Sequence, residues 1–204
     1  MFSRIEIRDI IIAWVALGVA FSFALGSSVP GGPSLLRAQG FDPIVTLFLL
    51  GIALITVGPG FVFHELSHKF VAQRYGFWAE FRMWPFGLVL ALVTSMLGVI
   101  FAAPGATYIS GNNISMSQNG RISLSGPLTN VAIAVLFLPL YLFGGSGVLG
   151  LVGAIGVRIN LILALFNMIP FGPLDGSKVL RWSLPVWVAV IVPLGLVLYF
   201  VIFT

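Results

Sequence analysis

The sequence of 204 residues contains no cysteine, and only 8% of its residues are charged. Without cysteine, the chain can form neither disulfide bonds nor thiolate ligands for a metal ion. A soluble domain usually has about 25% charged residues, so this chain is too poor in charge to cover a surface that faces water. The net charge is +4, but the basic residues lie at the ends of apolar runs. This arrangement excludes the basic patch of a nucleic-acid-binding protein.

Long stretches without any charged residue account for this composition. The longest are 10–36, 43–64, 83–120, 122–157 and 182–204. A membrane-spanning helix needs about 20 apolar residues, and almost no sequence is left for a soluble domain. We therefore expect an all-α polytopic membrane protein with about five or six transmembrane helices, a small membrane-associated β element and a re-entrant segment. It would form a single domain over residues 1–204, in contact with the lipid bilayer.

The spans are expected over residues 10–28, 43–73, 126–143, 148–168 and 183–204, the first and last being accessory. For the first span, the alternative is a cleaved signal peptide that ends near Gly26. A loop rich in Gly, Ser and Pro reaches from there to Asp42. In the second span, Pro59 between two glycines either kinks the helix for packing or opens it to water.

Two segments between the spans alternate apolar and polar side chains, which is typical of strands. Residues 77–84 predict one strand, stopped by Pro85. Residues 114–124 predict a hairpin around the Asn119-Gly120 turn. The next helix would then be capped by Ser125.

The positive-inside rule orients the chain, with Lys69 and Arg74 on the cytoplasmic side. Arg82 and Arg121 should lie on that side too, so residues 88–102 must enter and leave the membrane on one face. A full crossing by that stretch is the alternative. At 1.5 Å per residue, His64 lies about 7–15 Å from Lys69 and Arg74. In a hydrocarbon core about 30 Å thick, that places it in the cytoplasmic half.

Residues 64–68, HELSH, contain both histidines of the chain. Positions i and i+4 lie on one face of a helix, so both imidazoles can reach one metal ion. Glu65 lies about 100° around the helix, where it is better placed to act on water than to bind the metal. Two histidines and an adjacent glutamate in this spacing are typical of zinc metalloproteases.

A catalytic zinc ion needs a third protein ligand, and the sequence has no third histidine. The remaining acids are Glu6, Asp9, Asp42, Glu80 and Asp175. Two of them lie in the amino-terminal segment, Asp42 belongs on the opposite face of the membrane, and Glu80 lies beside Arg82. Asp175 follows a span that ends on the cytoplasmic side, so it is the predicted ligand. The alternative is an ordinary turn aspartate before glycine.

Two further motifs accompany HELSH: GPLTN at 126–130 and NMIPFGPLDG at 167–176. With them the chain resembles the site-2 protease family of intramembrane zinc metalloproteases, over about residues 59–181. The resemblance implies Zn²⁺ on His64, His68 and Asp175, and Glu65 as the general base. It places Asn167 near the scissile carbonyl, although an amide that braces helices is an alternative. No PDZ domain follows the GPLTN helix, unlike in many bacterial relatives.

The resemblance also implies strands that pair with an unwound substrate. Phe81, on the predicted strand, and Asn130, which could instead bridge spans, are the expected substrate-binding residues. The predicted function is a zinc-dependent endopeptidase of the cell membrane that hydrolyses transmembrane segments of other membrane proteins. The alternative is a transporter or ion-binding protein with a His/Glu/Asp relay. Arg158 either snorkels to the interface or lines the substrate cleft.

Overall fold

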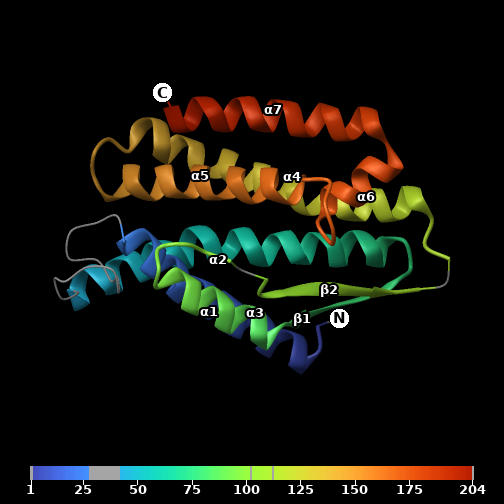
Figure 1. Cartoon of the computed structure of the whole chain (residues 1–204), viewed down its shortest axis with the longest axis horizontal. Coiled ribbons are helices and arrows are strands. Elements are labelled where there is room, and N and C mark those ends of the chain that lie inside the picture. The colour runs from blue at the N-terminus through green and yellow to red at the C-terminus, as the bar shows by residue number, and fades with distance from the viewer. Residues whose placement is uncertain (1, 28–41, 102, 112, 204) are drawn as a thin grey trace. The chain divides into compact units, whose positions relative to one another are not determined.

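The computed structural model describes residues 2–27, 42–101, 103–111 and 113–203, and Figure 1 shows their elements in chain order. Five helices in this part of the chain are long and apolar enough to cross a membrane: α1 (Arg4–Gly26), α2 (Pro43–Arg74), α4 (Met116–Phe143), α5 (Val148–Asn167) and α7 (Leu184–Phe203). The shorter elements are β1 (Trp78–Met83), α3 (Pro85–Ser95), β2 (Gly105–Ser110) and α6 (Asp175–Trp182). The expected all-α polytopic membrane protein is confirmed. Most of the loop predicted up to Asp42 lies outside the described residues.

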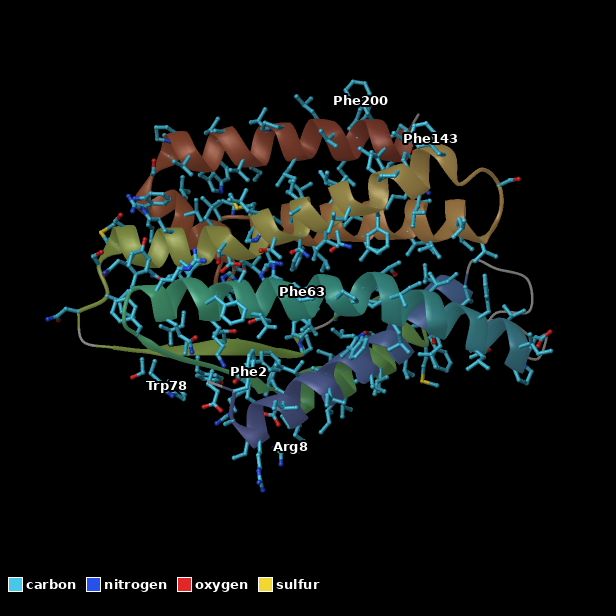
Figure 2. All side chains as sticks on the ribbon, turned by 180° about the vertical axis from the view of Figure 1, so that it is seen from behind. Phe2, Arg8, Phe63, Trp78, Phe143 and Phe200 are labelled. Atoms are coloured by element: carbon cyan, nitrogen blue, oxygen red, sulfur yellow. The ribbon has the colours of Figure 1, made fainter. Side chains whose placement is uncertain are left out.

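The spanning helices carry large apolar side chains on their outer faces. Phe143 at the end of α4 is 85% exposed and Phe200 on α7 is 57% exposed, and Figure 2 shows Phe200 pointing away from the neighbouring helices. Continuous apolar surface of this kind is rare on soluble monomers. It suits helices whose outer faces contact lipid.

The chain forms two compact units, each assembled from two separate stretches of sequence. The first consists of Met1–Val62 and Glu80–Tyr108, and the second of Phe63–Ala79 and Ile109–Thr204. The helix α2 and both strands pass from one unit to the other. The single domain expected from the sequence stays a prediction.

In the first unit, α1 packs against α3 (Figure 1). The indole N–H of Trp14 on α1 donates to the carbonyl of Leu54 on α2 (2.9 Å). The helix α2 is continuous through Pro59. A Cβ added at Gly58 would lie 1.9 Å from Trp14 Nε1. The glycine beside the proline therefore makes room for an indole, which favours the packing interpretation of this segment.

The helix α3 is shorter than the five helices that could cross a membrane. Its 11 residues span about 16 Å, which is about half of a hydrocarbon core. Trp84 precedes α3 in the sequence and Pro104 follows it. Trp84 donates its N–H to the carbonyl of Pro104 (2.9 Å), at one end of the sheet formed by β1 and β2. The chain leaves and returns at one end of this sheet, and the re-entrant segment stays a prediction; Ala102 lies outside the described residues. The strand β2 was not predicted.

The other edge of β1 is covered by acidic side chains of α1. Phe81 donates its N–H to Glu6 Oε1 (3.0 Å), and Met83 donates to Asp9 Oδ2 (3.3 Å). Glu6 and Phe81 are almost fully buried, at 0% and 1% exposure. The strand predicted over 77–84 is confirmed at 78–83, and at these two positions its edge away from β2 is occupied by carboxylates of α1. The substrate-binding role of Phe81 stays a prediction.

The predicted hairpin at 114–124 is wrong, because these residues begin α4. The Ser115 side chain accepts the N–H of Gln118, and the Gln118 side chain accepts the N–H of Ser115, which forms a capping box. The helix then runs uninterrupted to Phe143, with Pro127 inside it rather than in its first turn. Ser125, expected to be a cap, lies inside the helix and donates to the carbonyl of Ile122 (2.6 Å).

In the second unit, α4, α5, α6 and α7 share a core whose buried members include Val157, Met168 and Val179. At the end of α5, the carbonyl of Met168 accepts the indole N–H of Trp187 on α7 (2.8 Å). A Cβ added at Gly176 would lie 2.1 Å from the same carbonyl. The start of α6 is thereby held closely against the end of α5.

Candidate metal centre

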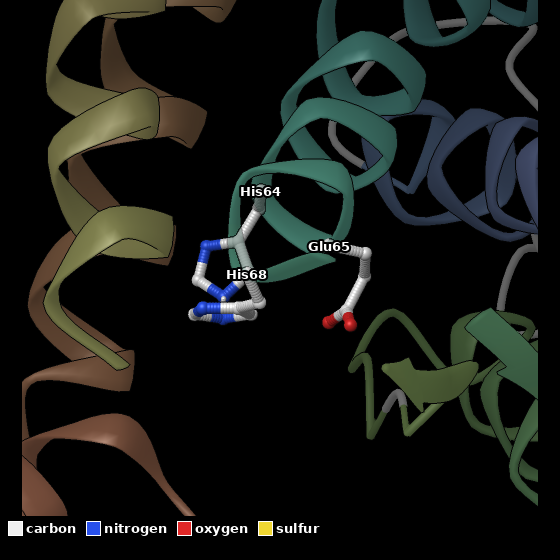
Figure 3. Close-up of side chains that lie close together, drawn as sticks. All are labelled: His64, Glu65 and His68. Carbon is white, nitrogen blue, oxygen red and sulfur yellow. Dashed lines mark hydrogen bonds between the residues drawn. The ribbon is translucent and has the colours of Figure 1, made fainter. Parts of the chain in front are cut away.

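His64 and His68 lie one turn apart on α2, and Figure 3 shows both rings projecting from the same face. They are 5% and 7% exposed, and their ring centroids are 4.7 Å apart. The helical spacing predicted from the sequence has brought two imidazoles to one point. All of the residues that surround them below belong to the second unit.

Each imidazole is held through its Nδ1 atom. His68 Nδ1 lies 2.8 Å from the backbone carbonyl of Ile122, and His64 Nδ1 lies 2.6 Å from Asn130 Oδ1. A carbonyl oxygen can only accept, so each Nδ1 carries the hydrogen. In the neutral imidazole, each Nε2 is then left with a lone pair. A ring held in this way is ready to bind a metal through Nε2.

Asp175, the first residue of α6, completes a triangle with the two rings. Its Oδ2 lies 3.2 Å from each Nε2, and the two Nε2 atoms are 3.1 Å apart. A tetrahedral zinc ion with bonds of about 2.0–2.1 Å places neighbouring donor atoms about 3.3 Å apart. The triangle therefore has the size of one face of such a site.

Three acceptor atoms that converge in a buried place repel one another unless a cation or a proton lies between them. The helix α4 leaves space there, since a Cβ added at Gly126 would lie 2.5 Å from His64 Nε2 and from His68 Cε1. Two nitrogens, one oxygen and no sulfur form a donor set that zinc accepts. These residues thus fit Zn²⁺.

Glu65 also approaches the imidazoles, which raises the question of which carboxylate would be the ligand. Ligand-capable atoms of His64, Glu65 and His68 lie within 4.8 Å of one another. Asp175 is closer, at 3.2 Å from both rings, and Figure 3 shows the Glu65 side chain leaving α2 in a different direction from the rings. The shorter distances favour Asp175 as the ligand and leave Glu65 beside it.

Comparison with known proteins gives a full-length match. A protein of Methanocaldococcus jannaschii named "Putative zinc metalloprotease MJ0611" is 41% identical over 201 residues, which cover 97% of this chain and 95% of that protein. This chain belongs to the site-2 protease family of zinc metalloproteases. Rip3 of Mycobacterium tuberculosis, with the same kind of name, is 29% identical over 84% of this chain and 38% of its own length. YwhC of Bacillus subtilis is 28% identical over 68% of this chain.

No family model matches the chain, and neither does any solved structure. Family membership rests on the relatives alone, and it agrees with the resemblance found in the motifs. It favours the zinc hydrolase over the transporter that the sequence left as the alternative.

Two motif residues of the site-2 protease family have surroundings that bear on their expected roles. Asn130 is fully buried, with Oδ1 at His64 and Nδ2 donating to Asn160 Oδ1 (3.1 Å). Its contacts are with His64 and Asn160, and its expected role in substrate binding stays a prediction. Asn167 is partly buried and donates one Nδ2 hydrogen to the carbonyl of Leu163 (2.9 Å). The second Nδ2 hydrogen of Asn167 is the one that the predicted oxyanion role would use, and that role stays a prediction.

Sequence reasoning missed Asn160 and misjudged Lys69. Asn160 is fully buried on α5, and the only signal for it was a lone amide inside an apolar span. Lys69, taken as a charge at the cytoplasmic surface, is 1% exposed. Arg74 is exposed and remains a surface charge at the end of α2, and Arg158 is exposed on α5.

Proposed function

We propose that this member of the site-2 protease family is an intramembrane endopeptidase that hydrolyses peptide bonds in transmembrane segments of membrane proteins. The observation that carries the proposal is the convergence of His64, His68 and Asp175 around Nε2 and Oδ2 atoms 3.1–3.2 Å apart. Two of these ligands lie on α2, a helix that is long and apolar enough to cross a membrane. A protease site on such a helix is placed to meet peptide bonds at membrane depth.

In the proposed reaction, zinc supplies Lewis-acid polarisation of the substrate carbonyl and makes water more acidic. Glu65 takes a proton from the attacking water and later returns it to the leaving amine. The second Nδ2 hydrogen of Asn167 would be donated to the oxygen that becomes negative in the transition state. A helical substrate must unwind first, because its carbonyls are otherwise occupied by intrahelical hydrogen bonds.

The proposal places the site in the cytoplasmic half of the cell membrane, as the positive-inside rule predicts from Arg74 and Arg121. Because the sequence lacks cysteine, single cysteines can report sidedness without background. We expect Arg74→Cys to react only with an impermeant maleimide added from the cytoplasmic side. Ser146→Cys, in the exposed turn between α4 and α5, should react only from the outside. The reverse pattern would place the zinc site in the other half.

The enzymatic role is tested with Glu65→Gln, which keeps the size of the side chain but removes its ability to take a proton. Purified protein in detergent or nanodiscs is assayed for zinc content and for cleavage of a model transmembrane peptide. Cleavage should fall by about 10²–10⁴-fold, while the zinc content stays at the wild-type level. Asp42→Asn, an acid-to-amide change far from the site in sequence, is the matched control. Undiminished cleavage by Glu65→Gln would refute the general-base assignment, and a zinc-binding wild type without proteolysis would favour an ion-binding protein.

A further inference from the structure

We propose that Asn160 is a positioning residue that fixes the tautomer of His64 through Asn130, and so keeps Nε2 of His64 available to the metal. The inference rests on the proposed zinc site, but it concerns a residue outside the ligand set and the catalytic pair. It begins from a chain of hydrogen bonds that connects α2, α4 and α5.

The chain of hydrogen bonds has three links, all between atoms of buried residues. Asn160 donates Nδ2 to the carbonyl of Gly156, one turn earlier on α5 (2.9 Å), and accepts Nδ2 of Asn130 on its Oδ1 (3.1 Å). Asn130 Oδ1 then lies 2.6 Å from His64 Nδ1. Both asparagines have 0% exposure, so water does not compete for these groups.

The Gly156 carbonyl at the start of this chain determines which group is the donor in each of the three hydrogen bonds. The Gly156 carbonyl has no hydrogen to give, so it must face the NH₂ group of Asn160. The oxygen of Asn160 then faces Asn130, which must present its own NH₂ group there. The oxygen of Asn130 is thereby turned toward His64, where it can only accept. Nδ1 of His64 must carry the hydrogen, and its Nε2 must be bare.

If the Asn130 amide were reversed, its NH₂ group would face His64 Nδ1. Nδ1 would then be the acceptor, and the hydrogen of the neutral ring would move to Nε2. A protonated Nε2 cannot bind a metal ion. The backbone of α5 therefore decides, through two amides, whether a side chain on α2 can be a ligand.

His68 is held differently and offers an internal comparison. Its Nδ1 faces the backbone carbonyl of Ile122 directly, so no side-chain substitution can reverse that acceptor. His64 depends on two side chains, and at membrane depth no bulk water can replace a lost partner. A substitution at Asn160 should therefore affect His64 and spare His68.

A simpler role for the two amides is to hold α4 and α5 together, as interhelical hydrogen bonds do in membranes. That role predicts a loss of thermal stability and no change in either imidazole. The two roles are separated by reading the tautomer itself, since the ring-nitrogen shifts of a neutral histidine distinguish Nδ1–H from Nε2–H.

The experiment uses the full chain labelled with ¹⁵N-histidine, where two histidines give two sets of ring signals. They are recorded without zinc, at alkaline pH so that the rings are neutral, and His68→Ala assigns them. We expect His64 to be in the Nδ1–H form in the wild type and to become a mixture of tautomers in Asn160→Leu, with His68 unchanged. The zinc affinity, measured by competition with a chelator, should fall about 10- to 100-fold.

Two further variants keep the test decisive. Asn160→Asp retains an acceptor for Asn130, so it should keep the wild-type tautomer and serves if Asn160→Leu does not fold. Thr129→Val is the matched control, because the Thr129 hydroxyl on α4 donates to the carbonyl of Ser125 within its own helix (2.9 Å). A wild-type tautomer and wild-type affinity in Asn160→Leu, with only a lower melting temperature, would overturn the proposal. The tautomer is read without metal or substrate, so it remains informative if the protease assignment fails.

Discussion

Two groups of buried carboxylates, one in each unit, have opposite surroundings. In the first unit, Glu6 and Asp9 face backbone N–H groups of β1, and Asp9 also pairs with Arg8 at 2.8 Å. In the second unit, Asp175 Oδ2 faces two imidazole nitrogens that carry lone pairs. Glu6 and Asp9 receive hydrogen bonds from donors of the protein. Asp175 Oδ2 instead meets ring nitrogens that are acceptors when the rings are neutral, while its Oδ1 lies 3.6 Å from Lys178 Nζ.

We infer that the difference separates a structural acid from a candidate metal ligand. A buried carboxylate that receives hydrogen bonds contributes to the fold and needs nothing further. A carboxylate among other acceptors needs a cation to offset the repulsion. Burial alone does not distinguish the two, because Glu6, Asp9 and Asp175 are 0%, 3% and 6% exposed. The kind of atom that each oxygen faces does distinguish them.

The strongest test of the comparison is Gly126→Ala. The added methyl group would lie 2.5 Å from both imidazoles, so the rings must move and the acceptor triangle is lost. We expect the purified variant to contain no zinc, measured by atomic emission. Gly195→Ala on α7, where a Cβ meets nothing within 4 Å, should keep its zinc. A zinc-loaded Gly126→Ala would mean that the metal does not bind between these rings.

Asp175→Asn should have the next largest effect. The amide removes the negative charge and leaves one weaker oxygen, so zinc affinity should fall by at least about 10²-fold, which corresponds to about 2.7 kcal/mol. Asp9→Asn, the same change in the first unit, should leave zinc affinity at the wild-type value. Both affinities are measured by chelator competition. Equal affinity for wild type and Asp175→Asn would remove Asp175 from the metal centre.

Glu6→Ala should have the smallest effect on the metal and a clear effect on the fold. It leaves the N–H of Phe81 buried without its carboxylate, which costs about 1–3 kcal/mol. Thermal unfolding in detergent should show a lower melting temperature, with zinc bound per folded protein unchanged. The exposed Arg8→Ala is the control, with a smaller loss of stability. If Glu6→Ala lost zinc without losing stability, the two groups would not differ as described.

The sequence predicted the convergence of His64, His68 and Asp175 better than it predicted the contacts of the first unit, for a physical reason. The spacing of His64 and His68 is local, because one helical turn brings them together whatever else the chain does. Asp175 could be found because few acids were available. The partners of Glu6 and Asp9 are more than 70 residues away, and no pattern in the residues predicts which strand an acid will cover.

Local ambiguity caused the remaining errors. The pattern of apolar and polar residues over 114–124 is compatible with a strand and with a helix. The reciprocal hydrogen bonds of Ser115 and Gln118 stabilise the start of a helix there. Asn160 gave no signal beyond its polarity, because its role depends on the orientation of Asn130 on another helix. The long apolar helices were predictable, since the length of an apolar run directly limits what it can span.

The indole of Trp187 has a practical consequence for protein design. It belongs to α7, the helix that the sequence marked as accessory, yet it donates to the Met168 carbonyl beside which Gly176 packs. A shortened version of the protein that ends after α6 would lose Trp187, the donor to the Met168 carbonyl. That carbonyl packs against Gly176, which directly follows Asp175. The last helix should therefore be retained in any minimal zinc-binding version, because removing it would loosen the segment that delivers the third ligand.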